Sequence, residues 1–454
     1  MITTQAMKSS SARFLLLVLM LWLAGPLAAY SATASAREPI GTLIARELPS
    51  LETLYQDWHR HPELSFHEER TSAELAGELK RAGFEVTPNF GGFGVVGVLR
   101  NGAGPTLLVR ADLDALPVKE QTGLPYASEE RTKDDLGNDV SVMHACGHDL
   151  HMTVLVGTAR LASQLKDRWQ GTLLFIGQPA EERVGGARAM LGEGLFTRFP
   201  QPDHCLALHV SGDLAAGTVG YTEGYALANV DSVDITFRGV GGHGSAPHKT
   251  KDPIVLAAQA VLAFQTIVSR ELEPGEAAVV TVGSIHGGTK RNIIPDEVKL
   301  ALTVRSYSDQ VRSNTLAAIT RIARGLAATA GLPEDKMPLV TTTDESVPAT
   351  YNDPALTSRL AASFQSWLGA ENVLKVKAAM GAEDFGLFGR TKEKIPICMF
   401  WLGASDPERV EESRRNGKPL PSLHSSLFAP IPKPTINTGV VAMMGAILDL
   451  APKK

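Results

Sequence analysis

The sequence predicts an α/β fold in which a mostly parallel sheet, covered by helices on both faces, is interrupted by an inserted βαββαβ unit. Apolar strand-like segments alternate with helical segments up to about Asn229, the order of elements then changes, and the alternation resumes at Asp353. Strands that alternate with helices favour a parallel sheet. The length of 454 residues favours two or three domains rather than one core.

The first part of the chain is expected to begin with helices. Apolar and charged residues recur at helical spacing over residues 40–81, and His61-Pro62 interrupts them because proline cannot continue a helix. Apolar and β-branched runs then predict strands, with one long helix between the earlier and the later pair. The strands are expected at residues 94–99, 106–111, 171–177 and 205–210, and the helix at 152–165.

The inserted unit has the order of a ferredoxin-like fold, which is a four-stranded antiparallel sheet with two helices on one face. Its elements are expected at residues 230–238, 253–270, 278–285, 297–307, 310–330 and 339–343. A helix at 353–368, a strand at 396–401 and a helix at 438–450 complete the main domain. The expected boundaries are 1–36 for a leader, 37–228 and 344–454 for the two parts of the main domain, and 229–343 for the insertion.

The first 36 residues have the layout of a secretory signal peptide. Lys8 and Arg13 precede an apolar run over residues 14–24, and small residues follow around Ala34 and Ala36. We expect cleavage after one of these alanines and a periplasmic or secreted mature protein without stable membrane association; an uncleaved anchor is the alternative. The formal net charge of -5 and the lack of a basic stripe argue against a nucleic-acid partner.

The chain has three cysteines, far fewer than a disulfide scaffold requires. If Cys146 has another use, Cys205 and Cys398 remain as candidates for a bond. We favour the interpretation that both are buried, reduced thiols.

One short segment gathers groups that bind metals. Cys146, His148 and His151 lie within six residues, and Gly147 allows the first two side chains to turn toward one point. Thiolate and imidazole groups are ligands of borderline-soft divalent metals. The alternative is a helix-capping turn with surface histidines.

Other candidate ligands follow expected strands. Glu181 and Glu182 come directly after the strand at 171–177, and ligands of α/β proteins gather at the carboxyl ends of parallel strands. In a metal hydrolase one carboxylate can bind the ion while the other takes a proton from the attacking water. His209 ends another expected strand, and His424 lies in a segment of small polar residues. Each histidine alone is more often structural.

Together these segments resemble the aminoacylase and carboxypeptidase-type metallohydrolases, in particular the N-acyl amino acid amidohydrolases that include hippurate hydrolase and the auxin-conjugate hydrolases. The resemblance implies a zinc-peptidase-like catalytic domain and an inserted lid or dimerisation domain. The matching motifs run in order through nearly all of the mature chain, at residues 59–64, 110–117, 146–151, 179–182, 241–248, 292–295, 380–385 and 422–428.

The resemblance implies a site for two divalent ions, with zinc or manganese expected first and nickel or cobalt compatible with the same ligands. The implied ligands are Cys146, His148, Glu182, His209 and His424. Glu181 matches the general base, and Asp114 matches a carboxylate that orients His148.

Further roles are also implied by resemblance. His243 matches a residue that reaches into the partner subunit's site and stabilises the developing oxyanion, so a homodimer is expected. Asn292 and Arg305 match residues that hold the substrate's carbonyl or carboxylate, a task that suits the fork of arginine. Asp112 departs from the peptidase relatives, which have a histidine ligand there; the deacylating branch shares the change and uses Cys146 instead. The sequence leaves open whether His151 is a metal ligand or a structural residue.

The implied activity is metal-dependent hydrolysis of the amide bond of small N-acyl amino acids such as hippurate. One alternative is an exported dipeptidase or carboxypeptidase with the same metal chemistry. Others are a non-catalytic binding protein on the same scaffold and a thiol hydrolase with Cys146 as nucleophile. The walls of the substrate pocket are expected to come from loops such as residues 403–421.

Overall fold

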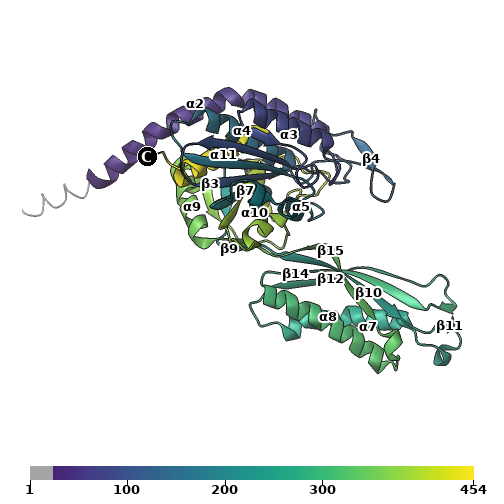
Figure 1. Ribbon diagram of the computed structural model, residues 1–454. Coiled ribbons are helices and arrows are strands. Elements are labelled where there is room, and N and C mark those ends of the chain that lie inside the picture. The colour runs from purple at the N-terminus through teal and green to yellow at the C-terminus, as the bar shows by residue number, and fades with distance from the viewer. Residues whose placement is uncertain (1–23, 454) are drawn as a thin grey trace, which may run out of the picture.

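The computed structural model describes residues 24–453, and Figure 1 shows a large α/β part joined to a smaller sheet with two helices. Residues 1–23 of the expected leader lie outside the described residues. Helix α2 (Ala24–Arg60) begins within the rest of the expected leader and continues into the large part. The expected α/β class with an inserted βαββαβ unit is confirmed.

The central sheet is mixed, with the expected parallel strands at its centre. Among the described residues it has eight strands, in the order β1-β2-β6-β3-β7-β18-β8-β17. The four in the middle pair in parallel, whereas β2 and β8 run antiparallel to their neighbours toward the centre. The strands are β1 (Glu85–Thr87), β2 (Val95–Asn101), β3 (Thr106–Asp112), β6 (Gly171–Gln178), β7 (His204–Ala215), β8 (Val219–Tyr221), β17 (Val373–Lys375) and β18 (Ile397–Ser405).

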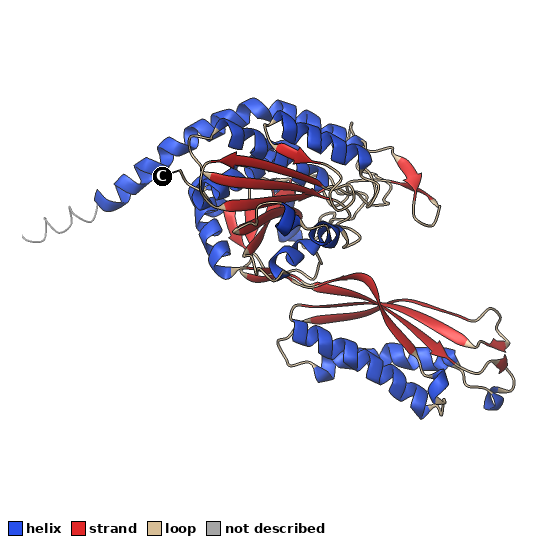
Figure 2. Ribbon diagram, in the orientation of Figure 1, coloured by secondary structure: helices blue, strands red, loops and turns tan. Residues whose placement is uncertain are grey.

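Helices cover both faces of this sheet, as Figure 2 shows, so its strands are buried and apolar. One face packs against α2, α3 (Glu69–Arg81), α4 (His148–Gln164), α9 (Pro354–Leu368) and α11 (Pro432–Leu450). The other packs against α5 (Gly186–Gly192), α6 (Leu195–Arg198) and the 3-10 helix η5 (Asp384–Arg390).

The insertion forms an antiparallel sheet that has four strands within residues 24–453, in the order β12-β14-β10-β15. Two helices pack on one face of it and enclose a separate apolar core around Phe237 and Phe264. The Asn229 side chain bonds both the hydroxyl and the backbone N–H of Ser306, which fixes the register of the central pair. The elements are β10 (Asn229–Arg238), α7 (Pro253–Thr266), β12 (Ala278–Gly287), β14 (Glu297–Ser306), α8 (Asp309–Thr329) and β15 (Leu339–Val347).

Short strand pairs complete the fold. β11 (Gly242–His243) pairs with β13 (Ile293–Ile294) at the tip of the insertion that points away from the central sheet in Figure 1. The other pairs are β4 (Arg131–Lys133) with β5 (Asp139–Ser141), and β9 (Gly224–Leu227) with β16 (Thr350–Asn352).

Helices α4 and α10 differ from the expectation in ways that have a clear physical reason. Helix α4 begins at His148, four residues before the expected start, because Gly147 adopts a left-handed φ of 79° and turns the chain into the helix. Helix α10 (Pro407–Asn416) was not expected, since Val410 is its only buried residue and no apolar periodicity marks it. Asp406 caps it by accepting hydrogen bonds from two backbone N–H groups.

All three cysteines lie in the described part of the chain, and all are free and buried. Cys205 and Cys398 sit on the neighbouring strands β7 and β18 without a disulfide bond, as favoured from the sequence. Burial raises the pKa of the Cys398 thiol to about 12. These two cysteines therefore behave as small apolar core residues.

Candidate active site

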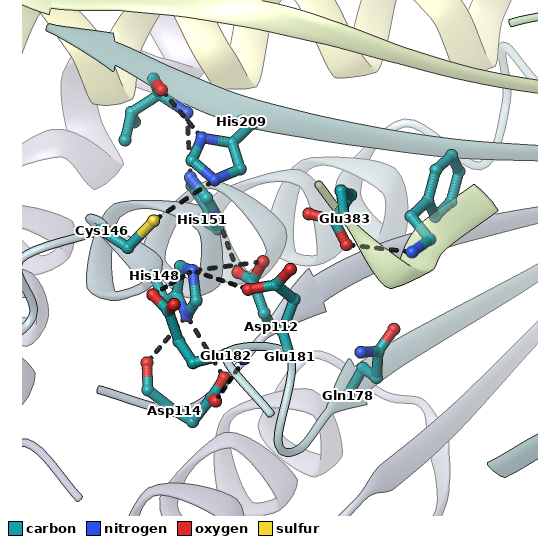
Figure 3. A network of polar contacts seen from close by, with 12 residues as sticks. Asp112, Asp114, Cys146, His148, His151, Gln178, Glu181, Glu182, His209 and Glu383 are labelled. Carbon is teal, nitrogen blue, oxygen red and sulfur yellow. Dashed lines mark hydrogen bonds and ion pairs between the residues drawn. The ribbon is translucent and has the colours of Figure 1, made fainter. Parts of the chain in front are cut away.

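The site lies where the central strands of the large sheet end. Asp112 is the last residue of β3, and Glu181 and Glu182 follow the end of β6. Helix α4 presents His148 in its first turn, next to His209 on β7. Figure 3 shows these side chains converging from separate elements on one polar cluster.

Cys146 lies between two groups of possible metal ligands. Its Sγ is 3.5 Å from Nε2 of His209 and 3.3 Å from Nε2 of His424. Ligand atoms of Cys146, His148 and His209 lie within 4.8 Å of one another, and the same holds for Cys146, Glu182 and His424. The structure thus brings together all five side chains expected to bind metal, as two triads that share the thiol.

Hydrogen bonds fix which ring nitrogens face the site. Nδ1 of His148 lies 2.7 Å from the backbone oxygen of Asp114, and Nδ1 of His209 lies 2.8 Å from that of Val210. Because a carbonyl oxygen only accepts, each Nδ1 carries a hydrogen, and Nε2 is the ring nitrogen that faces the site. Within residues 24–453, the buried Nε2 of His148 and Oε1 of Glu182 have no hydrogen-bond partner. These two atoms can both bind a metal and face the same site, an arrangement that fits a divalent cation.

The charge of the cluster also fits cations. Glu182 has its pKa raised to about 7 by burial and by Asp114, with His148 opposing. Burial lowers the pKa of His424, so its imidazole is neutral as a ligand must be. The pKa of the Cys146 thiol is raised by burial and then by Glu182, the opposite of what a cysteine nucleophile needs. A thiolate here requires a nearby cation, which argues for metal chemistry and against thiol chemistry.

His151 and Asp112 are occupied by other partners. Asp112 lies 2.6 Å from Nδ1 of His151, and Nε2 of His151 accepts a hydrogen bond from the backbone N–H of Val210 at 2.9 Å. Arg110 donates to the other oxygen of Asp112 at 2.6 Å. With both ring nitrogens engaged, His151 has the structural role that the sequence left open.

Arg110 and Glu383 lie in the motifs at residues 110–117 and 380–385, but the sequence did not indicate a role for either of them. Arg110 is fully buried beneath the site, and its guanidinium bonds Asp112, Glu383, Asp384 and Gln178. A charged residue inside an otherwise apolar strand was the available signal, because a buried arginine needs carboxylate partners. The cluster fixes the carboxylates that surround Glu181.

Glu181 lies beside His148 among buried carboxylates. Its Oε2 lies 3.9 Å from Nε2 of His148, and its side chain forms a further close group with Asp112 and Glu383. Burial and then the charge of Glu383 raise its pKa well above the usual range, so cations bound at the neighbouring ligands are needed to keep this carboxyl ionised. Asp114, expected to orient His148, does so mainly through its backbone oxygen, with its carboxylate 3.3 Å away.

The backbone around the site is strained. Ala180 and Val184, on either side of the two glutamates, have positive φ values of 49° and 47°, and His424 has 66°. Such conformations cost about 1–3 kcal/mol each and concentrate at functional sites. The backbone N–H of His424 bonds the oxygen of Ala145 at 2.9 Å, which joins the two loops that carry Cys146 and His424.

A cavity of about 510 Å³ opens over the cluster. Arg305 on β14 lies in its wall with Ser232 and Thr303, and donates to the backbone oxygen of Met380 at 2.8 Å. In the described part of the chain, no residue of 403–421 lines this cavity, so the expectation that this loop forms its walls is wrong. That segment folds into helix α10 instead.

His243 and Asn292 are not brought to the cluster within one chain. His243 is exposed on β11, where its Nδ1 accepts a hydrogen bond from the backbone N–H of Ser245, and the backbone oxygen of Asn292 accepts one from Gly244. Both residues sit at the tip of the insertion, away from the central sheet (Figure 1). A single chain therefore assembles the metal ligands, Glu181 and Arg305, but not these two residues.

Comparison with known proteins adds independent evidence. Residues 108–414 match the model of peptidase family M20/M25/M40. The chain is 34% identical over 355 residues to an N-acetylcysteine deacetylase of Bacillus subtilis, covering 78% of this chain and 88% of that protein. It is 35% identical over 355 residues to thermostable carboxypeptidase 1 of Saccharolobus solfataricus, covering 77% and 85% respectively.

The structure resembles a solved dinuclear metal-binding protein. The YXEP protein of Bacillus subtilis, described as a dinuclear metal-binding peptidase of the M20 family, superposes with a TM-score of 0.70 at 28% identity. The match covers 89% of this chain and 98% of that one. The two ligand triads that share Cys146 agree with two divalent ions.

Proposed function

The chain belongs to peptidase family M20/M25/M40 and is a metal-dependent amidohydrolase; on this premise we propose that it cleaves hippurate-like N-acyl amino acids into a carboxylic acid and a free amino acid. The observation that carries the proposal is the shared cavity: Cys146 sits between the two ligand triads, with Glu181 beside them and Arg305 in the same wall.

Different residues of this chain have separate roles in the proposed reaction. When bound, two divalent ions supply Lewis acidity toward water and the amide carbonyl. Glu181 takes a proton from the attacking water and returns it to the leaving amine; the support for this role is its place beside His148 and outside both triads that contain Cys146. Arg305 binds the carboxylate of the amino acid with its two parallel donors. We place zinc or manganese first among the ions.

We also propose a homodimer in which His243, and with it Asn292, completes the site of the partner subunit. The support is an apolar outer face on the insertion. Helix α7 with its extension (Pro253–Glu271) is apolar enough by composition to cross a membrane, yet only 33% of it is buried. Its inner face packs on the sheet, while Val255 and Leu262 are exposed. In the described residues, β12 is also an edge strand of this sheet. Sedimentation or light scattering tests the dimer, and a monomer with full activity would refute it.

For the cell, we propose export through the N-terminal segment, on the basis of its charged start and apolar run. Fractionation of cells that express the full chain tests this. A processed protein in the periplasm or medium supports export, and an unprocessed cytoplasmic protein contradicts it.

The test of function is a hydrolysis screen of N-acyl amino acids against unblocked dipeptides with the metal-loaded protein. The carboxypeptidase relative keeps peptide cleavage as a second candidate, since Arg305 could also bind a peptide's terminal carboxylate. A dipeptidase needs an anionic side chain that binds the free amine of its substrate. Glu345 lies in the cavity wall, but its carboxylate is already paired with Arg183 at 3.2 Å. We therefore expect N-acyl substrates to be cleaved faster, and faster dipeptide cleavage would reverse the assignment.

A further inference from the structure

A second cavity of about 350 Å³, here named the side cavity, adjoins the metal cavity. Four residues line both spaces, so the two cavities are direct neighbours: Leu227, Gly381, Trp401 and Leu423. This common wall lies beside the metal ligands, because Leu423 precedes His424 and the ring centroid of Trp401 lies 5.5 Å from that of His209. Nothing in the mechanism above uses this space.

The side cavity is mostly apolar. Leu214, Leu227, Val376, Trp401 and Leu423 line it with apolar side chains. Leu227 is 3% exposed and Leu214 is 8% exposed, so these walls are held by the surrounding core. The charged residues that line it, Asp213 and Lys377, are themselves exposed.

The geometry points to the acyl group of the substrate as the occupant; we infer that the side cavity selects aromatic or medium-chain acyl groups over acetyl. This inference rests on the proposed function. The amide carbon carries three groups in different directions: the oxygen, the nitrogen with the amino acid, and the acyl carbon. The amino acid's carboxylate binds at Arg305, which lines the metal cavity but not the side cavity. The acyl carbon is therefore the substituent directed to the side cavity.

Size supports an acyl group larger than acetyl. A buried apolar cavity of about 150 Å³ is enough to bind benzene. The side cavity exceeds this volume, and Leu214, Leu227, Val376 and Trp401 give it apolar walls. A phenyl ring or a chain of several methylenes therefore fits it, whereas a single methyl group leaves most of it empty. Contacts with such walls distinguish substrates by about 10- to 200-fold per methylene.

The experiment compares kcat/KM for N-acetyl, N-hexanoyl and N-benzoyl derivatives of one amino acid, using the metal-loaded full chain. We expect the two larger acyl groups to exceed acetyl by at least about tenfold. Ala379→Phe and Val376→Phe each fill the side cavity from a different position, and neither residue lines the metal cavity. Each should remove the preference while N-acetyl cleavage stays within about twofold. Ala328→Phe, on the exposed surface of α8, is the matched control.

The outcomes separate this inference from the proposed function. The side cavity does not bind the acyl group if the native protein cleaves N-acetyl substrates best. The same conclusion follows if the Ala379→Phe and Val376→Phe variants fold but lose kcat/KM equally for all three acyl groups. A variant that changes only the preference among amino acids assigns the cavity to the amino acid side chain and overturns the inference. If no N-acyl amino acid is cleaved, the proposed function fails first and the inference fails with it.

Discussion

The carboxyl group of Glu68 accepts a hydrogen bond from the backbone N–H of Ala180 at 2.7 Å, directly before Glu181. Glu68 is fully buried, and Ala180 has the left-handed φ of 49°. The contact joins the start of helix α3 to the strained turn after β6, across 112 residues of sequence. We therefore expect Glu68 to position Glu181, the proposed general base.

Replacing Glu68 should lower kcat without removing metal. Burial and the charge of Asp114 raise the pKa of Glu68 to about 8, so the carboxyl is largely protonated at neutral pH. Glu68→Gln keeps the accepting oxygen and should stay within about threefold of native, whereas Glu68→Ala releases the turn and should lower kcat by about 10- to 100-fold. Metal content by mass spectrometry should remain two ions per chain in both. Metal loss in Glu68→Ala would show that the residue supports the ligands instead.

Cys146→Ser should empty both metal positions, because the thiol belongs to both ligand triads. We expect metal content below one ion per chain and activity reduced by more than about 100-fold. Cys398→Ser is the control: that thiol is buried on β18 and accepts a hydrogen bond from Thr357, so the change should lower stability and leave the metal in place. Retention of two ions in Cys146→Ser would separate the thiol from the metal site.

The sequence could place the metal ligands because each follows a recognisable strand end or motif. It could not show which ring nitrogens are free, since the partners of His148 and His151 are backbone groups 34 and 59 residues away. The position of Arg305 in the cavity depends on how the insertion sits against the main domain, which no local pattern encodes. The shared position of Cys146 in both triads is likewise visible only in three dimensions.

The fold was predictable where apolar periodicity was strong. The insertion followed its expected order because each of its strands buries one face on α7 and α8. The direction of β2 and β8 was not predictable, because strand pairing depends on distant partners rather than on local pattern. Helix α10 was missed for a different reason, since it is held by its cap and one buried valine.

His148 and His151, one helical turn apart, should respond differently to mutation. His148→Ala removes a free Nε2 from the site and should lower metal content to about one ion or less. His151→Ala leaves Asp112 and the N–H of Val210 without partners, which should lower the free energy of unfolding by about 1–3 kcal/mol with two ions retained. Metal titration and urea unfolding measure the two effects. Metal loss in a folded His151→Ala variant would restore it as a ligand.

The pH dependence of stability should carry a contribution from His59. Burial opposes its charge, but hydrogen bonds to Asp149 and Glu120 raise its pKa to about 9 from the usual 6.5. A raised pKa means that the folded state holds the proton more tightly, so the stabilisation is full below pH 6.5 and is lost as the pH rises through about 9. The difference is about 3 kcal/mol at about 1.4 kcal/mol per pKa unit.

His59→Gln isolates this contribution. The free energy of unfolding of the metal-loaded native protein and of the variant should differ most at pH 6 and least at pH 9.5. His61→Gln, two residues along and partly exposed, is the matched control and should leave the native profile unchanged. A constant difference between the native protein and His59→Gln across this range would mean that His59 is not charged in the folded state.

Glu181→Gln tests the base directly. The amide has nearly the same shape as the carboxylate but cannot accept the proton of water, so turnover should fall by about 10²- to 10⁴-fold. Glu181 lies in the cavity wall beside His148 without belonging to either triad that contains Cys146, so metal content should stay at two ions. Glu182→Gln is the matched control, since it changes the neighbouring carboxylate that does belong to a triad, and it should weaken metal binding. Measuring kcat and metal content for both variants separates proton transfer from ligation, and turnover in Glu181→Gln within tenfold of native would remove Glu181 from the role of base.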